Sequence, residues 1–467
     1  MLFSSISFIY YFLPVVLILY FLVPHKQKNF ILLVASLFFY FYGEPVYSAL
    51  MVLSSLSGYL HGLWIEKAKS WKKYRRIPLI SSIVIAIGVL LYFKYADFII
   101  ENVNWLFGKD TSLLRLALPL GISFYTFQIL SYTIDVYRGT AQVQRSFLDF
   151  STYVSLFPQL IAGPIVRYTT VEAELNCRTH SWKNCAYGIN RFIIGLSKKI
   201  ILANTLGELG RLLSESNQKT VLMYWILAFA FMLQVYFDFS GYSDMAIGLG
   251  RIFGFKFLEN FNYPYISTSI SEFWRRWHIS LGTWFRDYVY IPMGGSRVGK
   301  IKWIRNIIVV WFLTGFWHGA QWNFIFWGLY FAVLLTVEKL FMSVIEKVPA
   351  LIRHLYVLCF LTISFVFFNA DGMGKVVENL KGMVGISGIP FINKETTYYL
   401  RSYMVVLVIS AISATPLFTR AVNKLKTNKK CERLLNTIEP LVHVSLMLVV
   451  TAFLIDGSFN PFLYFRF

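Results

Sequence analysis

The stretch Trp311-Phe-Leu-Thr-Gly-Phe-Trp-His-Gly-Ala-Gln-Trp-Asn-Phe-Ile-Phe-Trp-Gly328 places a histidine, His318, inside an uncharged run of 32 residues, 306–337. As a single α-helix that run would measure about 48 Å, whereas the hydrocarbon core of a bilayer is roughly 30 Å thick. We therefore expect two segments that break near Gly315 and Gly319, with the histidine at membrane depth. An ionisable side chain at that depth faces protein or water, and by default it marks a functional site.

The composition of the chain is that of an integral membrane protein. Of its 467 residues, 57% are apolar and 18% aromatic, and the mean hydropathy is +0.56. A soluble protein of this length would need more polar surface. The net charge of +20 favours basic cytosolic loops and contact with anionic lipid over nucleic-acid binding. The four cysteines and seven histidines are scattered, so we expect free thiols, no disulfide framework and no metal site.

Twelve apolar segments predict an all-α, polytopic membrane protein with roughly 11–12 transmembrane helices, forming a single domain over residues 1–467. The segments are 5–23, 29–42, 46–64, 78–95, 114–135, 187–205, 221–238, 304–317, 321–343, 352–368, 400–416 and 440–456. Basic clusters at 66–76 and 420–433 should lie in the cytosol, because lysine and arginine are enriched on that side. Counting crossings back from the first cluster places the N-terminus outside the cell.

Two further segments do not read as simple membrane spans. Residues 157–164, Phe-Pro-Gln-Leu-Ile-Ala-Gly-Pro, are apolar but short and bracketed by prolines, which favours a re-entrant segment. Residues 273–288 place aromatic side chains on one helical face and arginines mostly elsewhere, which predicts an interfacial amphipathic helix. Gln159 is expected to satisfy backbone groups freed in the first segment, and Asp238 and Asp244 to pair with lysine or arginine.

Two histidines are candidates for catalysis. His318 can take a proton from a hydroxyl and return it, because the unperturbed pKa of histidine lies near neutrality. The alternative is a packing histidine that is hydrogen-bonded to a carbonyl. His278 lies 40 residues earlier, beside Arg275 and Arg276. It is either an ordinary interfacial histidine or a residue at the cytosolic mouth of the cavity that holds His318.

The arginines of this region are candidates for binding a phosphorylated donor. Arg275, Arg276 and Arg286 lie among the indoles of Trp274 and Trp277. Guanidinium groups bind phosphate in a bidentate way and stack on aromatic faces, so this cluster can hold the phosphates of a nucleotide-containing molecule. For each arginine taken alone, the preference for positive charge on the cytosolic side is the better explanation.

Together these motifs resemble the membrane-bound O-acyltransferase family, most strongly from about residue 115 to 330. The similar motifs are Pro119-Leu-Gly-Ile-Ser-Phe-Tyr-Thr-Phe-Gln, Phe157-Pro-Gln-Leu-Ile-Ala-Gly-Pro-Ile, Phe237-Asp-Phe-Ser-Gly-Tyr-Ser-Asp, Ser271-Glu-Phe-Trp-Arg-Arg-Trp-His-Ile-Ser-Leu and Phe316-Trp-His-Gly-Ala. The opening Met1-Leu-Phe-Ser-Ser and the ending Asn460-Pro-Phe-Leu-Tyr-Phe-Arg-Phe resemble the alginate O-acetyltransferase membrane subunits in particular.

The resemblance implies a many-helix fold around a central tunnel in the bacterial cytoplasmic (inner) membrane. His318 matches the position treated as catalytic, where it would act as general base, and His278 matches the second motif histidine, which would position the donor or stabilise negative charge. The implied reaction transfers an acetyl group from cytosolic acetyl-CoA to a hydroxyl. The acetyl group then reaches an exported polysaccharide directly or through an extracytoplasmic partner of the SGNH-hydrolase-like group.

Two other functions stay open at this point. A carrier-protein thioester could replace acetyl-CoA as the donor, as in D-alanyl transfer to a surface polymer. A proton-coupled transporter with His318 as the relay belongs to another class, and no motif in the sequence favours it. The sequence does not identify the polysaccharide.

Overall fold

A computed structural model describes residues 1–70, 74–161, 163–386 and 388–457, and these residues form helices without any strand. The chain forms two compact units, one made of residues 1–192 and 245–258 and the other of residues 193–244 and 259–467. The long helices α9 (Trp182–Ser197) and α11 (Val221–Ile252) contribute residues to both. The predicted single membrane domain stays a prediction.

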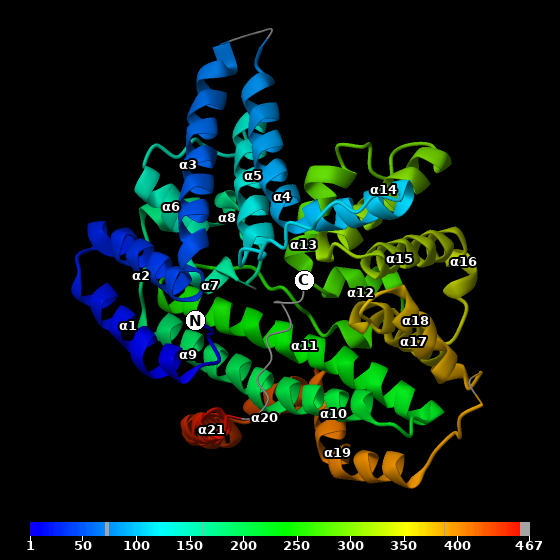
Figure 1. Cartoon of the computed structure of the whole chain (residues 1–467). Helices are drawn as coiled ribbons and strands as arrows, with labels where there is room; N and C mark the ends of the chain where they lie inside the picture. Colours follow the sequence, from blue (N-terminus) through cyan, green and yellow to red (C-terminus); the bar gives the residue numbers. More distant parts are fainter. Residues whose placement is uncertain (71–73, 162, 387, 458–467) are drawn as a thin grey trace. The chain divides into compact units, whose positions relative to one another are not determined.

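The first unit contains most of the N-terminal helices. They are η1 (Ser7–Phe12), α1 (Leu13–Leu22), η2 (His25–Gln27), α2 (Lys28–Gly43), α3 (Pro45–Lys67), η3 (Ala68–Ser70), α4 (Ile77–Phe107), α5 (Ile122–Arg138), α6 (Phe147–Ser155), α7 (Phe157–Leu160) and α8 (Tyr168–Asn176). Helices α3, α4 and α5 lie side by side (Figure 1).

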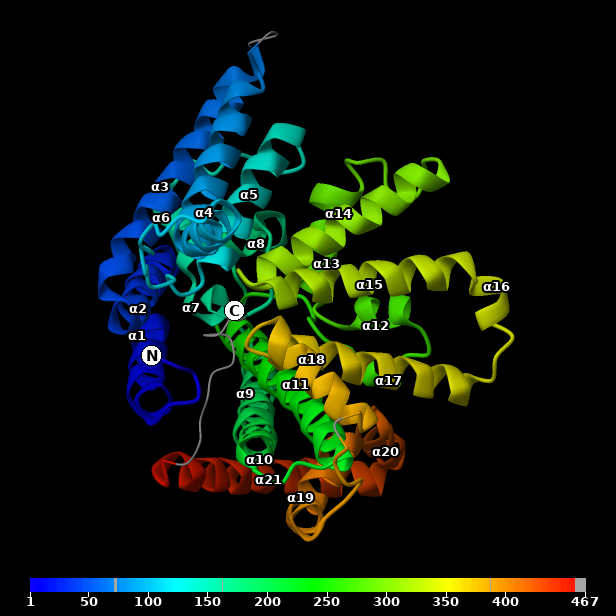
Figure 2. The same cartoon turned by 45° about the vertical axis from the view of Figure 1, so that its right-hand side comes forward.

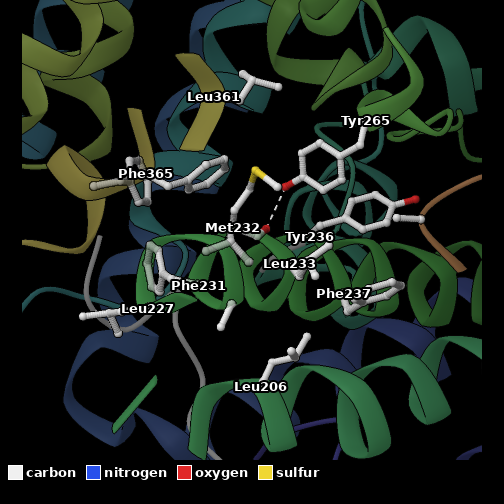
Figure 3. Close-up of a cluster of buried hydrophobic side chains, with 14 of the residues drawn as sticks. Leu206, Leu227, Phe231, Met232, Leu233, Tyr236, Phe237, Tyr265, Leu361 and Phe365 are labelled. Atoms are coloured by element: carbon white, nitrogen blue, oxygen red, sulfur yellow. Dashed lines mark hydrogen bonds between the residues drawn. The ribbon is translucent and has the colours of Figure 1, made fainter. Parts of the chain in front are cut away.

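The second unit contains the remaining elements. They are η4 (Lys198–Ala203), α10 (Asn204–Glu215), η5 (Pro264–Ile266), α12 (Ile270–Arg276), α13 (Ile279–Phe285), η6 (Arg286–Tyr290), α14 (Lys300–His318), α15 (Trp322–Leu340), α16 (Met342–Ile345), α17 (Ala350–Asn369), α18 (Met373–Val384), α19 (Lys394–Ser413), α20 (Leu417–Lys426) and α21 (Lys429–Ile455). Its core packs α10, α11 and α17 around Tyr265, whose hydroxyl donates a hydrogen bond of 2.7 Å to the carbonyl of Met232 (Figure 3).

Six helices among the described residues are long and apolar enough to cross a membrane, judged by length and composition. A seventh crossing is added if the bent pair α19 and α20, which turns by 63°, forms one span. The six are Pro45–Ser70, α4, α11, α15, α17 and α21. Each of the twelve predicted apolar segments overlaps a helix, although residues 114–121 of the fifth segment precede α5. Several of these helices are short, such as α2 with 16 residues and α5 with 17. The all-α, polytopic membrane architecture is confirmed.

The uncharged run around His318 is broken at Gly319, the second of the two glycines near which a break was expected. Helix α14 ends at His318, Gly319 has extended backbone, and α15 starts at Trp322. Gly315, in contrast, stays inside α14, where it faces Gly328 of α15. A Cβ on Gly315 would overlap the Phe324 carbonyl oxygen. Gly315 and Gly328 therefore let α14 and α15 pack backbone against backbone, and both views show these two helices side by side (Figures 1 and 2).

The segment 273–288 is not one continuous amphipathic helix, so this expectation was wrong. Helix α12 ends at Arg276 and α13 begins at Ile279. Between them His278 has left-handed backbone, with φ 44° and ψ 53°. No proline or glycine marks this break, so side-chain spacing alone favoured a continuous helix. Because of this break, the His278 ring does not lie on the face of a continuous amphipathic helix, and His278 is only 2% exposed.

The start of α12 is held by a buried carboxylate from α15. Glu338, which is 1% exposed, accepts hydrogen bonds from the amides of Ile270 at 2.6 Å and Ser271 at 3.0 Å. The first amides of a helix lack partners within the helix and carry the positive end of its dipole, so a carboxylate is a favourable acceptor there. This contact fixes α12, and with it the residues that follow, against α15.

The proline-bracketed segment forms the short helix α7, and its four residues are all buried. The Gln159 side chain donates to the carbonyl of Tyr153 at 2.5 Å, which confirms that it satisfies a backbone group. Four parts of the expected motifs, namely Lys72, Lys73, Ala162 and the C-terminal residues 460–467, lie outside the described residues.

Replacing the carboxylate that holds α12 should destabilise the fold. Glu338→Ala leaves the buried amide of Ile270 and the partly buried amide of Ser271 without this acceptor, at about 1–3 kcal/mol for a buried unsatisfied group, whereas Glu338→Gln keeps one acceptor oxygen and should lose less. Thermal unfolding of the purified protein in detergent, followed by tryptophan fluorescence, measures both variants. Glu346→Ala, at an exposed glutamate of the same region, is the control. Equal midpoints for Glu338→Ala and Glu346→Ala would contradict the assignment.

Candidate active site

Both candidate histidines line one pocket in the second unit. Side chains of α11, α12, α14, α15 and α17 form its walls, and its empty volume is about 570 Å³, including space open to the outside. Besides His278 and His318 the lining includes Trp274, Trp277 and Asp238. The lining is otherwise mostly aromatic, which makes the pocket a largely apolar space with a few polar groups, as is typical of small-molecule sites.

His318 stands at the end of α14 among aromatic rings. Its ring is perpendicular to that of Trp327, with centroids 5.0 Å apart, and to that of Phe368, at 5.2 Å. Edge-to-face contacts of this kind hold a ring in one orientation. The side chain is half-buried, so it is both fixed and reachable from the pocket.

His278 is enclosed more deeply than His318. Its ring stands perpendicular to that of Phe239, with centroids 4.7 Å apart, and its Nδ1 lies 3.1 Å from Oδ1 of Asn260. Burial lowers the pKa of the His278 imidazole, so the ring is neutral near pH 7. The other ring nitrogen, Nε2, is buried and has no hydrogen-bond partner among the described residues.

Three polar atoms of pocket-lining residues lack partners in the described part of the chain. They are Nε2 of His278 and the indole nitrogens of Trp274 and Trp327. Leaving a buried polar atom without a hydrogen bond costs about 1–3 kcal/mol. Native structures seldom carry several such atoms together, and a bound molecule or water is the usual explanation. These three atoms are therefore available for hydrogen bonds with a ligand or with water in the pocket.

A buried ion pair borders the pocket. Nζ of Lys199 lies 2.5 Å from Oδ1 of Asp238, and the side chains are 3% and 4% exposed. A neighbouring pair joins Lys198 and Asp244 at 2.7 Å. Both aspartates therefore pair with lysine, as the sequence predicted. Lys199 comes from the π-helical segment η4, a local widening of the helix that often occurs at functional sites.

The three arginines do not line the pocket. Arg276 pairs with Glu272 at 2.9 Å, Arg286 pairs with Asp287 at 2.7 Å, and Arg275 is exposed. The structure thus brings Trp274 and Trp277 together with both histidines and leaves the arginines at its surface. Their binding of donor phosphates stays a prediction.

Asn260 is a site residue that sequence reasoning missed. It is fully buried and contacts His278 from 18 positions earlier in the chain. The one available signal was a polar residue at the start of the aromatic and arginine-rich region, and no periodicity connects that residue to a histidine across a helix break.

Comparisons with known proteins identify the family of the chain. The model of the MBOAT, membrane-bound O-acyltransferase family, matches residues 141–373, which include both histidines. The chain is 42% identical to the probable alginate O-acetylase AlgI of Azotobacter vinelandii, over 80% of this chain and 76% of that protein. It is 35% identical to the peptidoglycan O-acetyltransferase of Helicobacter pylori, over 86% and 83%.

A third relative shares only the central part. The chain is 33% identical to the teichoic acid D-alanyltransferase of Bacillus subtilis, over 48% of this chain and 59% of that protein. The two O-acetylating relatives match a larger share of this chain than the D-alanyltransferase does, and this difference favours the O-acetylating branch over the D-alanylating one. The protein therefore belongs to the membrane-bound O-acyltransferase family, in which it is an O-acyltransferase of the alginate O-acetylase-like branch.

Proposed function

We propose that this protein transfers an acetyl group from cytosolic acetyl-CoA to a hydroxyl, for the O-acetylation of an exported cell-envelope polysaccharide. The observation that carries the proposal is the pocket that joins His318 and His278 inside aromatic walls and contains unpartnered polar atoms. The names of the relatives, which include an alginate O-acetylase and a peptidoglycan O-acetyltransferase, support acetyl as the group and a polysaccharide as the final acceptor.

In the proposed reaction His318 is the general base. Its ring takes the proton of the acceptor hydroxyl, the hydroxyl oxygen attacks the thioester carbonyl carbon, and the carbon–sulfur bond breaks. The proton then passes to the departing thiolate, so the histidine returns to its starting state. General-base catalysis of this kind contributes typically about 10² to 10⁴ in rate. In this proposal the aromatic rings around His318 limit the access of water, which would otherwise hydrolyse the thioester.

In this proposal the acyl donor binds on the side of the pocket next to the end of α12. Trp274 and Trp277 supply the apolar wall, and Arg275, Arg276 and Arg286 supply positive charge for the phosphates. Arg276 and Arg286 already hold carboxylates, so phosphate binding there would exchange one anion for another. Arg275 is exposed and forms no such ion pair within the described part of the chain.

The proposed setting is the bacterial cytoplasmic membrane, with the N-terminus outside the cell and the basic clusters in the cytosol. Donor and acceptor then approach the pocket from opposite sides. The acetyl group reaches the polysaccharide directly or through an extracytoplasmic partner of the SGNH-hydrolase-like group. Membrane lipid surrounds the chain.

The identity of the donor is tested by labelling. Membranes that contain the protein receive either radiolabelled acetyl-CoA or a carrier protein charged with labelled D-alanine. Label should enter the envelope polymer only from acetyl-CoA. Incorporation from the charged carrier alone would replace the acetyl-CoA assignment with the reaction named for the Bacillus relative.

Removal of the proposed base should abolish acyl transfer without unfolding the protein. His318→Ala is expected to reduce acetylation by about 10² or more, the lower range for a general base, while size-exclusion elution and membrane insertion stay unchanged. His443→Ala, at a histidine in α21 that does not line the pocket, is the matched control. Near-normal acetylation by His318→Ala would remove the histidine from the mechanism.

The arginine cluster should control affinity for the donor. Arg275→Ala/Arg276→Ala is expected to raise the KM for acetyl-CoA, because two positive charges next to the phosphates are lost, with little change in kcat at saturating donor. Arg297→Ala, at another exposed arginine of the same region, serves as the control for general loss of charge. An unchanged dependence on donor concentration would leave these arginines with a purely topological role.

A further inference from the structure

The backbone at His278 is held in a costly conformation. Of the described residues other than glycine, only Arg115, Tyr263 and His278 have positive φ. A left-handed residue with a side chain persists only where its surroundings enforce it, and such residues cluster at functional sites. At His278 the surroundings are supplied by Asn260, whose backbone carbonyl accepts a hydrogen bond of 2.9 Å from the amide of Ile279.

The side chain of Asn260 has only one orientation that satisfies its neighbours. Its Oδ1 accepts a hydrogen bond from the backbone amide of Ser280 at 3.2 Å, and an amide N–H can only donate. The Ser280 hydroxyl donates to the same oxygen at 2.9 Å, and Nδ2 donates to Oγ of Ser243 at 3.2 Å. If the oxygen and nitrogen of the Asn260 amide were exchanged, its NH₂ group would face the N–H of Ser280, and both are donors. The oxygen therefore faces Ser280 and His278.

This orientation decides which nitrogen of His278 carries the proton. Two polar atoms lie near Nδ1 of the neutral ring, Oδ1 of Asn260 at 3.1 Å and Oγ of Ser280 at 3.5 Å. The Ser280 hydroxyl donates to the nearer Oδ1, at 2.9 Å, so the geometry favours Nδ1 as a donor to the same oxygen. A neutral imidazole has one N–H, so Nε2 carries a lone pair and acts as an acceptor. That nitrogen is buried, belongs to a pocket-lining residue and has no partner among the described residues.

We propose that Asn260 is a positioning residue that fixes His278 as the Nδ1–H tautomer, so that Nε2 accepts a hydrogen bond from an O–H or N–H group of a substrate in the pocket. This assignment rests on the proposed acyl transfer and refines it. An acceptor nitrogen repels negative charge, so His278 holds a substrate group instead of stabilising the oxyanion that forms at the thioester carbonyl.

The first test uses substitutions that separate the acceptor from the packing. Asn260→Asp keeps an acceptor for Nδ1–H and should retain activity within a few fold. Asn260→Leu has similar volume but no acceptor, and it should lose roughly 10- to 100-fold, the range found when the partner that fixes the tautomer of a metal-bound histidine is removed. Asn262→Leu, at an exposed asparagine two positions on, is the control and should behave as the unaltered protein.

The pH profile supplies a readout that a merely structural role would not move. The carboxylate of Asn260→Asp raises the pKa of His278, because a nearby negative charge favours the imidazolium. Protonation of the general base His318 also stops the reaction, so the titration of His278 is followed through its own ¹⁵N signals, and in Asn260→Asp it should occur at a higher pH than in the unaltered protein. Titration of His278 at the same pH in both proteins would overturn the contact between Asn260 and Nδ1.

The tautomer itself is measured by ¹⁵N NMR of protein labelled at histidine, with His278→Asn used to assign the signals. Nδ1 should carry the proton in the unaltered protein, and Asn260→Leu should shift the ring toward the Nε2–H form. An Nε2–H signal in the unaltered protein would overturn the proposal. This measurement needs no substrate, so it decides the tautomer even if acetyl transfer itself is disproved.

Kinetics then distinguish the two sources of the substrate group. If an amide N–H of the donor binds Nε2, Asn260→Leu raises the KM for acetyl-CoA. If the acceptor hydroxyl binds it, kcat falls at saturating acetyl-CoA and the KM for the donor is unchanged. A variant that folds, as judged by size-exclusion elution, and changes neither value would contradict the role of Asn260.

Discussion

The carboxylate of Glu338 on the first amides of α12 is the contact on which the pocket depends. Helix α12 is too short to define its own position, and the chain turns sharply after it at His278. A buried charge from α15 fixes where α12 begins, and the hydrogen bonds of Asn260 fix the turn that follows it and the start of α13. Between these points Trp274 and Trp277 meet the aromatic side chains of α14, α15 and α17. The wall of the pocket is thus set by polar contacts at both ends.

The two histidines reach the same pocket by different structural means, which suits them to different tasks. His318 ends a long helix and is held by ring contacts, so it keeps access to the pocket and freedom to exchange a proton. His278 sits in a strained turn and is held by a hydrogen bond to one of its nitrogens. A ring with one nitrogen committed and the other buried in the neutral form is suited to orientation. This division agrees with a single general base in the proposed reaction.

Much of the helical architecture was readable from the sequence, because runs of apolar residues in a membrane protein must form helices. The break after His318 followed from the length of the uncharged run, and the pairing of Asp238 and Asp244 followed from the cost of burying charge. The break at His278 was not readable, since left-handed backbone there is imposed by contacts and not by its own residue type. Asn260 and Glu338 were missed for the same reason. Both act on residues far along the chain, and periodicity reports only on neighbours within a helix.

The glycines of α14 and α15 give the pocket one rigid wall. Where Gly315 meets Gly328 no side chain separates the two backbones, so these helices have no layer that can compress or slide. His318 follows Gly315 by one helical turn and inherits that rigidity. Helix α17, in contrast, meets the pocket through the side chains of Ser364, Phe365 and Phe368. A side chain added at Gly315 would push the backbones of α14 and α15 apart and displace His318, so the place of this histidine depends on a glycine that does not line the pocket.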